Sequence, residues 1–126
     1  MKKVVISGKR TAELVDVPDP SPKENWAVVK VHVAPMCTEY KAYLAGGEHA
    51  YLGHEAVGEV VAVAQPGRVA VGDRVVVMPQ YPCGKCELCV AGDYIYCEHC
   101  YDVAEFLGSR EGTATYAQYL LSLIHI

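Results

Sequence analysis

The chain has 126 residues, of which 52% are hydrophobic and 21% are charged, and its formal net charge is −4. This length suits one domain, and the apolar fraction is high enough for a packed core, which excludes wholesale disorder. The eleven Lys and Arg residues are scattered through an acidic chain, so we expect no nucleic-acid partner and no membrane partner.

The first residues are predicted to form neither an export signal nor a membrane span. Lys2 and Lys3 are followed by only a short apolar stretch, and no later stretch approaches the length of a membrane-spanning helix. Without an export signal, the six cysteines point to a reducing compartment, where thiols bind metals or do chemistry more often than they form disulfides. We therefore expect a cytoplasmic protein.

Most of the chain is predicted to be β-structure. Short β-branched, apolar stretches alternate with turns rich in Gly and Pro, which is typical of strands joined by tight connections. The predicted strands are residues 3–7, 12–17, 26–34, 55–64 and 74–78, with a last strand within residues 112–121.

Only one stretch, residues 37–45, has the composition of a helix, and Gly46-Gly47 predicts its end. Many short strands and a single short helix predict a mainly β fold. We expect a partly open β-barrel to which a cysteine-rich metal lobe is attached.

Four cysteines dominate the second half of the chain. Two, two and seven residues separate Cys83, Cys86, Cys89 and Cys97, which places four thiols on one compact loop. A closed zinc site takes four thiolates at about 2.3 Å, and binding contributes on the order of 10 kcal/mol of folding energy to a lobe with little apolar content. The set is complete at Cys97, so Cys100 is predicted to be a spare thiol.

An iron–sulfur cluster is the weaker alternative for this loop. The first three cysteines share the spacing of bacterial ferredoxins, but the fourth cysteine there follows after three residues and precedes a proline. Here seven residues intervene and Glu98 follows Cys97. The spacing therefore favours zinc.

A second group of candidate ligands lies earlier in the chain. Cys37 is at the head of the predicted helix, where the backbone dipole favours a thiolate, and His54 lies just before a predicted strand. The imidazole of His54 could bind the same ion as Cys37. On their own, the two residues do not distinguish metal ligands from incidental or buried side chains.

The order of these motifs resembles a known family. Gly53-His54-Glu55 with Gly58, the turn Gly72-Asp73-Arg74-Val75 and then the four-cysteine lobe resemble the zinc-containing alcohol dehydrogenases of the medium-chain dehydrogenase/reductase superfamily. The resemblance covers about residues 4–120. It implies a GroES-like catalytic domain over residues 1–120, with the zinc lobe at 83–100 inside it.

The resemblance also implies roles for individual residues. Cys37 and His54 become ligands of a catalytic zinc, the four lobe cysteines become ligands of a structural zinc, and Glu55 becomes a carboxylate beside the catalytic metal. The family carries a proton-relaying Ser or Thr two residues after its catalytic cysteine, and this position is Glu39 here. Either Thr38 or Tyr40 could take over the relay, or Glu39 could act as the base itself.

The implied activity is hydride transfer between an alcohol or polyol and nicotinamide. An open-sided zinc binds the substrate oxygen and lowers its pKa, while NAD or NADP carries the hydride. Two alternatives stay open: a non-enzymatic GroES-like zinc-binding scaffold and an iron–sulfur electron carrier.

Several parts of such an enzyme are not found in this sequence. No Gly-x-Gly-x-x-Gly fingerprint occurs, so we expect the NAD(P) site and a third catalytic ligand to lie outside this chain and the chain alone to be inactive. We interpret residues 121–126 as a non-native tail, because they match one reading frame of a common transposon-derived library end. We expect the full-length protein to be a homo-oligomer.

Overall fold

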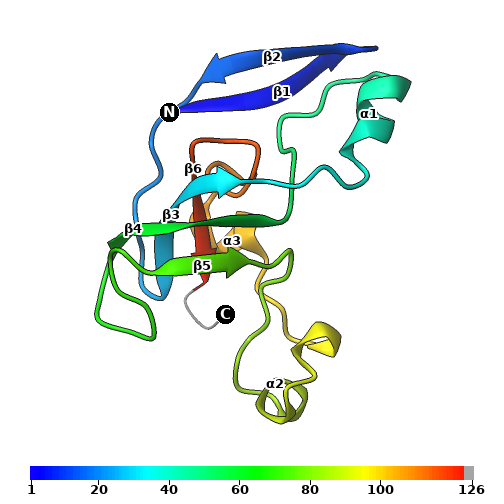
Figure 1. Ribbon diagram of the computed structural model, residues 1–126. Helices are drawn as coiled ribbons and strands as arrows, with labels where there is room; N and C mark the ends of the chain where they lie inside the picture. Colours follow the sequence, from blue (N-terminus) through cyan, green and yellow to red (C-terminus); the bar gives the residue numbers. More distant parts are fainter. Residues whose placement is uncertain (124–126) are drawn as a thin grey trace.

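The computed structural model describes residues 1–123, which form two antiparallel sheets (Figure 1). Strands β1 (Lys2–Gly8) and β2 (Thr11–Asp16) pair as a hairpin. The larger sheet has the order β5-β4-β3-β6, and its strands are β3 (Trp26–Val33), β4 (Ala56–Val63), β5 (Arg74–Val77) and β6 (Tyr119–Leu123). The prediction of a mainly β, partly open barrel is confirmed.

Within residues 1–123, four short helices lie between these strands, so the prediction of a single helix is wrong. They are α1 (Glu39–Ala45), α2 (Glu87–Ala91), the 3-10 helix η1 (Tyr94–Tyr96) and α3 (Val103–Leu107). Three of them have five residues or fewer, too short to show a helical period in the sequence. None of the helices within residues 1–123 is long and apolar enough to cross a membrane.

Strand β3 organises the core because its first half is buried on both faces. Ala27 and Val29 pack with Val60 and Leu120 on one side of the sheet. On the other side Trp26 is 1% exposed and stacks on Phe106 with ring centroids 5.5 Å apart, which attaches α3 to the sheet. Large aromatic rings contribute most per residue to such a core.

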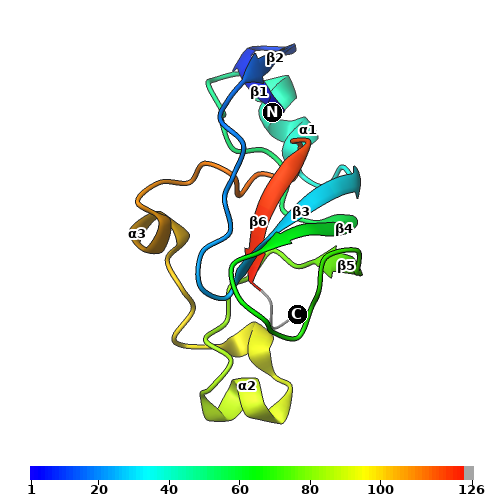
Figure 2. The same ribbon diagram turned by 90° about the vertical axis from the view of Figure 1, so that its left-hand side faces the viewer.

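The hairpin is joined to the barrel through the segment that precedes β6. The amide of Val4 donates to the carbonyl of Tyr116 at 2.8 Å, and the amide of Gln118 donates to that of Lys2 at 3.1 Å. The buried Lys3 ammonium pairs with Glu111 at 2.9 Å. These contacts join the hairpin to the same segment that pairs with β3. The hairpin and the larger sheet nevertheless remain two separate sheets, so the barrel is only partly closed (Figure 2).

Two predicted elements have boundaries that differ from the structure by more than one residue. The helix begins at Glu39, so Cys37 lies before it rather than at its head. The last strand covers residues 119–123 and not 112–121. Residues 121–123 of the predicted tail are paired with β3, and residues 124–126 lie outside the described part of the chain; the origin of the tail stays a prediction.

A glycine allows β4 to approach β3 closely. A Cβ built on Gly58 would overlap the carbonyl oxygen of Lys30 and lie 2.5 Å from Cγ1 of Val29. The register between the two strands shifts on both sides of this point. Only a residue without a side chain fits there.

Replacing Gly58 by alanine is therefore expected to lower the free energy of unfolding by about 1–3 kcal/mol, because the new methyl group must displace β3. Urea unfolding followed by circular dichroism measures this change. Gly8→Ala is the matched control, since its Cβ would lie at an ordinary 3.8 Å from Thr11. Equal losses in the two variants would contradict the crowding at Gly58.

Candidate functional site

The four lobe cysteines come together in space. Their sulfur atoms all lie within 4.8 Å of one another, and the Cys83–Cys89 and Cys86–Cys97 pairs are both 3.9 Å apart. A tetrahedron with zinc–sulfur distances of about 2.3 Å has edges of about 3.8 Å. The arrangement could therefore hold a tetrahedral metal ion, and it is the only such group of three or more candidate ligands within residues 1–123.

Local backbone structure positions these thiols. Cys86 is the N-cap of α2, Cys89 lies within α2, and Gly92 ends that helix in the left-handed conformation. The next turn, η1, then brings Cys97 back, where its sulfur accepts hydrogen bonds from the amides of Cys83 at 3.3 Å and His99 at 3.4 Å. Amide donors of this kind stabilise a thiolate.

The thiols differ in acidity. The amide of Cys83 is the largest influence on Cys97 and, with that of His99, lowers the pKa of the Cys97 thiol to about 6 against the effect of burial. Burial raises the pKa of Cys89 to about 12, and hydrogen bonds with neighbouring thiols add to this. The protein alone thus favours the thiolate at Cys83 and Cys97 and disfavours it at Cys89, and a bound cation would be needed to stabilise all four.

A second cluster forms around the carboxylate of Glu39. One carboxylate oxygen lies 2.8 Å from Nδ1 of His54, and the other accepts a hydrogen bond from the amide of Cys37 at 2.9 Å. Nε2 of His54 lies 4.0 Å from the carboxylate of Glu55. The structure therefore brings four of the five predicted catalytic residues into one group.

Thr38 lies at the start of α1, outside the group formed by the other four residues. It is the N-cap residue of α1, but its side chain makes no capping hydrogen bond, and Tyr40 after it is 46% exposed. Within residues 1–123, neither side chain forms a hydrogen bond with His54, which pairs with Glu39 instead. Their proposed relay role is untested.

The loop that carries His54 is fixed by a glycine and a neighbouring strand-like segment. Gly53 has φ +82°, and a Cβ there would lie 2.7 Å from the ring of Tyr116. The amides of Thr115 and Tyr116 donate to the carbonyls of Gly53 at 3.4 Å and Leu52 at 3.1 Å. Glycine is required both for the backbone conformation and for the close approach.

Tyr116 is a site residue that sequence reasoning missed. Its hydroxyl donates to the carbonyl of Pro35 at 3.1 Å. Burial raises the pKa of Tyr116, and the charges of Glu39 and Cys37 add to the effect, which places the phenol beside both residues. Nothing in the sequence separates it from the other eight tyrosines, because its position follows from long-range pairing.

Glu39 itself is held as an anion. Burial raises its pKa, but hydrogen bonds from its own amide and that of Cys37, together with His54, outweigh burial and lower the pKa below the usual value. Its side chain is 10% exposed, whereas that of His54 is 39% exposed. The carboxylate therefore lies beneath the histidine.

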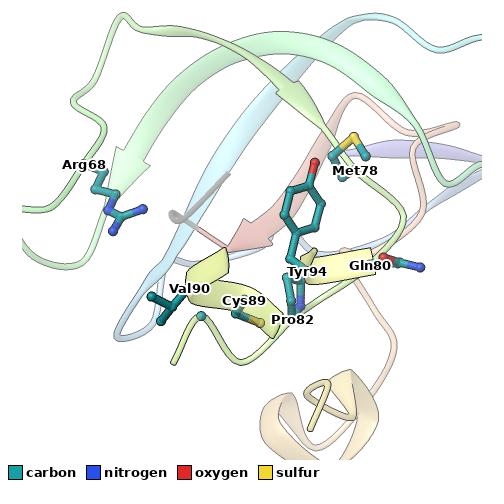
Figure 3. Close-up of a pocket in the computed structure, with 8 residues that line it drawn as sticks. Arg68, Met78, Gln80, Pro82, Cys89, Val90 and Tyr94 are labelled. Atoms are coloured by element: carbon teal, nitrogen blue, oxygen red, sulfur yellow. The ribbon is translucent and has the colours of Figure 1, made fainter. Parts of the chain in front are cut away.

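The two clusters are far apart. Helix α1, which follows Cys37, and helix α2, which carries Cys89, lie at opposite ends of the molecule in both views (Figures 1 and 2). A cavity of about 460 Å³ lies beside the lobe, with Arg68, Gln80 and Tyr94 among its lining residues (Figure 3). No residue of the Glu39 cluster lines it.

A partly open β-barrel with a four-thiol lobe inserted before its last strand defines the class of the domain. Residues 23–123 match the family described as the alcohol dehydrogenase GroES-like domain. The chain belongs to the zinc-containing alcohol dehydrogenase family, in which it corresponds to the N-terminal GroES-like domain.

Individual relatives agree with this assignment. Sorbitol dehydrogenase of Bacillus subtilis is 31% identical and matches 95% of this chain and 35% of its own length. An acryloyl-coenzyme A reductase of Sulfurisphaera tokodaii is 34% identical over 79% of this chain and 32% of its own.

Alcohol dehydrogenase TADH from Thermus sp. ATN1 superimposes with a TM-score of 0.74 at 28% identity, covering 98% of this chain and 37% of that structure. The chain thus spans about a third of the length of the sorbitol dehydrogenase and of the acryloyl-coenzyme A reductase. Their names differ in substrate, so the similarity by itself assigns no substrate to this chain.

The acidity of the lobe thiols predicts their reactivity in reduced, metal-free protein. At pH 7 we expect iodoacetamide to modify Cys97 at least about ten times faster than Cys89, because the thiolate is the nucleophile. Lowering the pH through about 6 should slow the reaction of Cys97 as its thiolate is protonated. Peptide mass spectrometry measures the modification rates of Cys97 and Cys89. Equal rates at pH 7 would contradict the difference in thiol pKa between the two residues.

Proposed function

We propose that this chain is the N-terminal catalytic domain of a zinc-dependent, NAD(P)-linked alcohol dehydrogenase that transfers hydride between an alcohol or polyol and nicotinamide. The observation that carries the proposal is the presence of two separate clusters: a closed set of four thiols and an incomplete pair, Cys37 and His54, joined by Glu39. A scaffold needs only the first cluster. The incomplete pair favours an enzyme.

The residues fit the two metals that the family implies. Cys83, Cys86, Cys89 and Cys97 would hold a structural zinc, since four sulfur donors at tetrahedral spacing leave no position for a substrate. Cys37 and His54 would hold a catalytic zinc with a further ligand from outside this chain, because one thiolate and one imidazole are common ligands of open zinc sites.

A zinc ion bound there supplies Lewis-acid activation of the substrate oxygen, and NAD or NADP, bound outside this chain, takes the hydride. The chain's own residues prepare the site. Cys37 is exposed and His54 is partly exposed, so both are accessible from solvent. The hydroxyl of Tyr116 is protonated at neutral pH and donates to the carbonyl of Pro35, and burial raises its pKa further.

The remaining features of the protein are proposals of the same kind. All six cysteines are free thiols, which suits the cytoplasm. Because the chain spans about a third of its relatives, we place the nucleotide-binding domain, the third ligand and the surfaces for homo-oligomer formation in sequence beyond it.

Metal analysis tests the proposed structural zinc. We expect the 126-residue chain to retain one zinc ion after gel filtration, to hold little at Cys37 and His54, and to show no dehydrogenase turnover. Cys97→Ser should lose the ion, because a fourth thiolate is removed. Cys100→Ser is the control and should keep it; loss of zinc in both variants, or iron in place of zinc, would contradict the assignment.

The catalytic role is tested in the full-length protein. Replacing Cys37 or His54 by alanine should lower kcat/KM by at least about 10³-fold, since metal activation of the oxygen contributes several kcal/mol. The lobe zinc should remain, as measured by mass spectrometry of the metal. His32→Ala, on an exposed position of β3, is the control. Full activity without Cys37 and His54 would refute the proposed function.

A further inference from the structure

We infer that Glu39 is a positioning residue: its carboxylate holds the proton of His54 on Nδ1 and thereby leaves Nε2 as the nitrogen that binds metal. This inference rests on the proposed function only for the identity of the metal site. It assigns Glu39 a role other than that of the base, which was one of the options that the sequence left open.

The contact between Glu39 and His54 sets the tautomer. Oε1 of Glu39 lies 2.8 Å from Nδ1 of His54, which is within hydrogen-bonding distance. An ionised carboxylate only accepts, so in this contact Nδ1 carries the proton. In the neutral imidazole the lone pair is then on Nε2.

The second oxygen of Glu39 fixes the carboxylate in place. Oε2 accepts from the amide of Cys37 at 2.9 Å, so one side chain connects the segment of Cys37 with the loop of His54. Both proposed ligands are therefore positioned by the same group. Metal-binding histidines commonly donate their second N–H to a carboxylate in this way, which orients the ring.

The same contacts make Glu39 unsuited to act as the base. Both of its oxygens already accept hydrogen bonds, and its side chain is only 10% exposed beneath the more exposed imidazole. A proton taken up from a substrate would neutralise the carboxylate and weaken its contacts with Cys37 and His54. The position that carries the hydroxyl relay in the related family thus holds the ligand-orienting group here.

The tautomer of His54 is measured directly by NMR of the full-length, metal-free protein labelled with ¹⁵N-histidine, at a pH where His54 is neutral. His54→Asn identifies the signal. We expect the proton on Nδ1 in the wild type. In Glu39→Ala the Nδ1–H fraction of His54 should fall, because alanine has no acceptor. In Glu39→Gln it should also fall, because the glutamine amide has one acceptor oxygen for two donors, Nδ1–H of His54 and the amide of Cys37.

Cobalt(II) titration of the same proteins, followed by visible absorption, gives the second readout. Glu39→Ala and Glu39→Gln should weaken binding at the Cys37 and His54 site by about 10–100-fold. Glu48→Gln, which alters an exposed carboxylate in the loop after α1, is the matched control and should bind as the wild type does.

Three results would overturn the inference. One is a wild-type proton on Nε2, and another is an unchanged tautomer in both Glu39 variants. The third is unchanged cobalt affinity together with loss of a basic group from the pH profile of kcat/KM, which would identify Glu39 as the base. If the wild type bound no cobalt at this site, the proposed function would fail, while the NMR result would still decide the role of Glu39.

Discussion

The fold depends on the segment that leads into β6, because it pairs with three parts of the chain at once. Tyr116 and Gln118 bond to β1, Thr115 and Tyr116 bond to the loop before His54, and the carbonyl of Gln118 accepts from Val31 of β3 at 2.9 Å. Leu120, next along, is fully buried in the core. A single segment thus connects the hairpin with the larger sheet and also positions the loop that carries His54.

The two clusters show how burial and charge suit different tasks. In the lobe, four sulfur atoms face one another and no position remains for a guest, so a metal there can only stabilise structure. Around Glu39, a largely buried carboxylate contacts two more exposed residues, Cys37 and His54, which are the proposed ligands and are accessible from solvent. The lobe has little apolar core of its own, whereas the Glu39 cluster is built on the barrel.

Much of this was predictable from the sequence. The strands follow from β-branched runs, and the lobe follows from cysteine spacing that brings four thiols together. Helices α2, η1 and α3 could not be predicted, since each has five residues or fewer and shows no helical period in the sequence. Residues 112–118 were predicted to be part of the last strand, but they form turns, bends and one isolated bridge, between Ala117 and Lys3. The contacts of Glu39 and Tyr116 are long-range, and no local pattern encodes them.

The central claim is that one barrel carries a sealed sulfur site and a separate open site. X-ray absorption at the zinc edge of the full-length protein tests this most directly. We expect a sulfur shell at about 2.3 Å together with a nitrogen and oxygen shell at about 2.0–2.1 Å. In Cys37→Ala the second shell should disappear and a pure sulfur environment should remain. A spectrum with sulfur alone in the wild type, or no zinc at all, would contradict the claim.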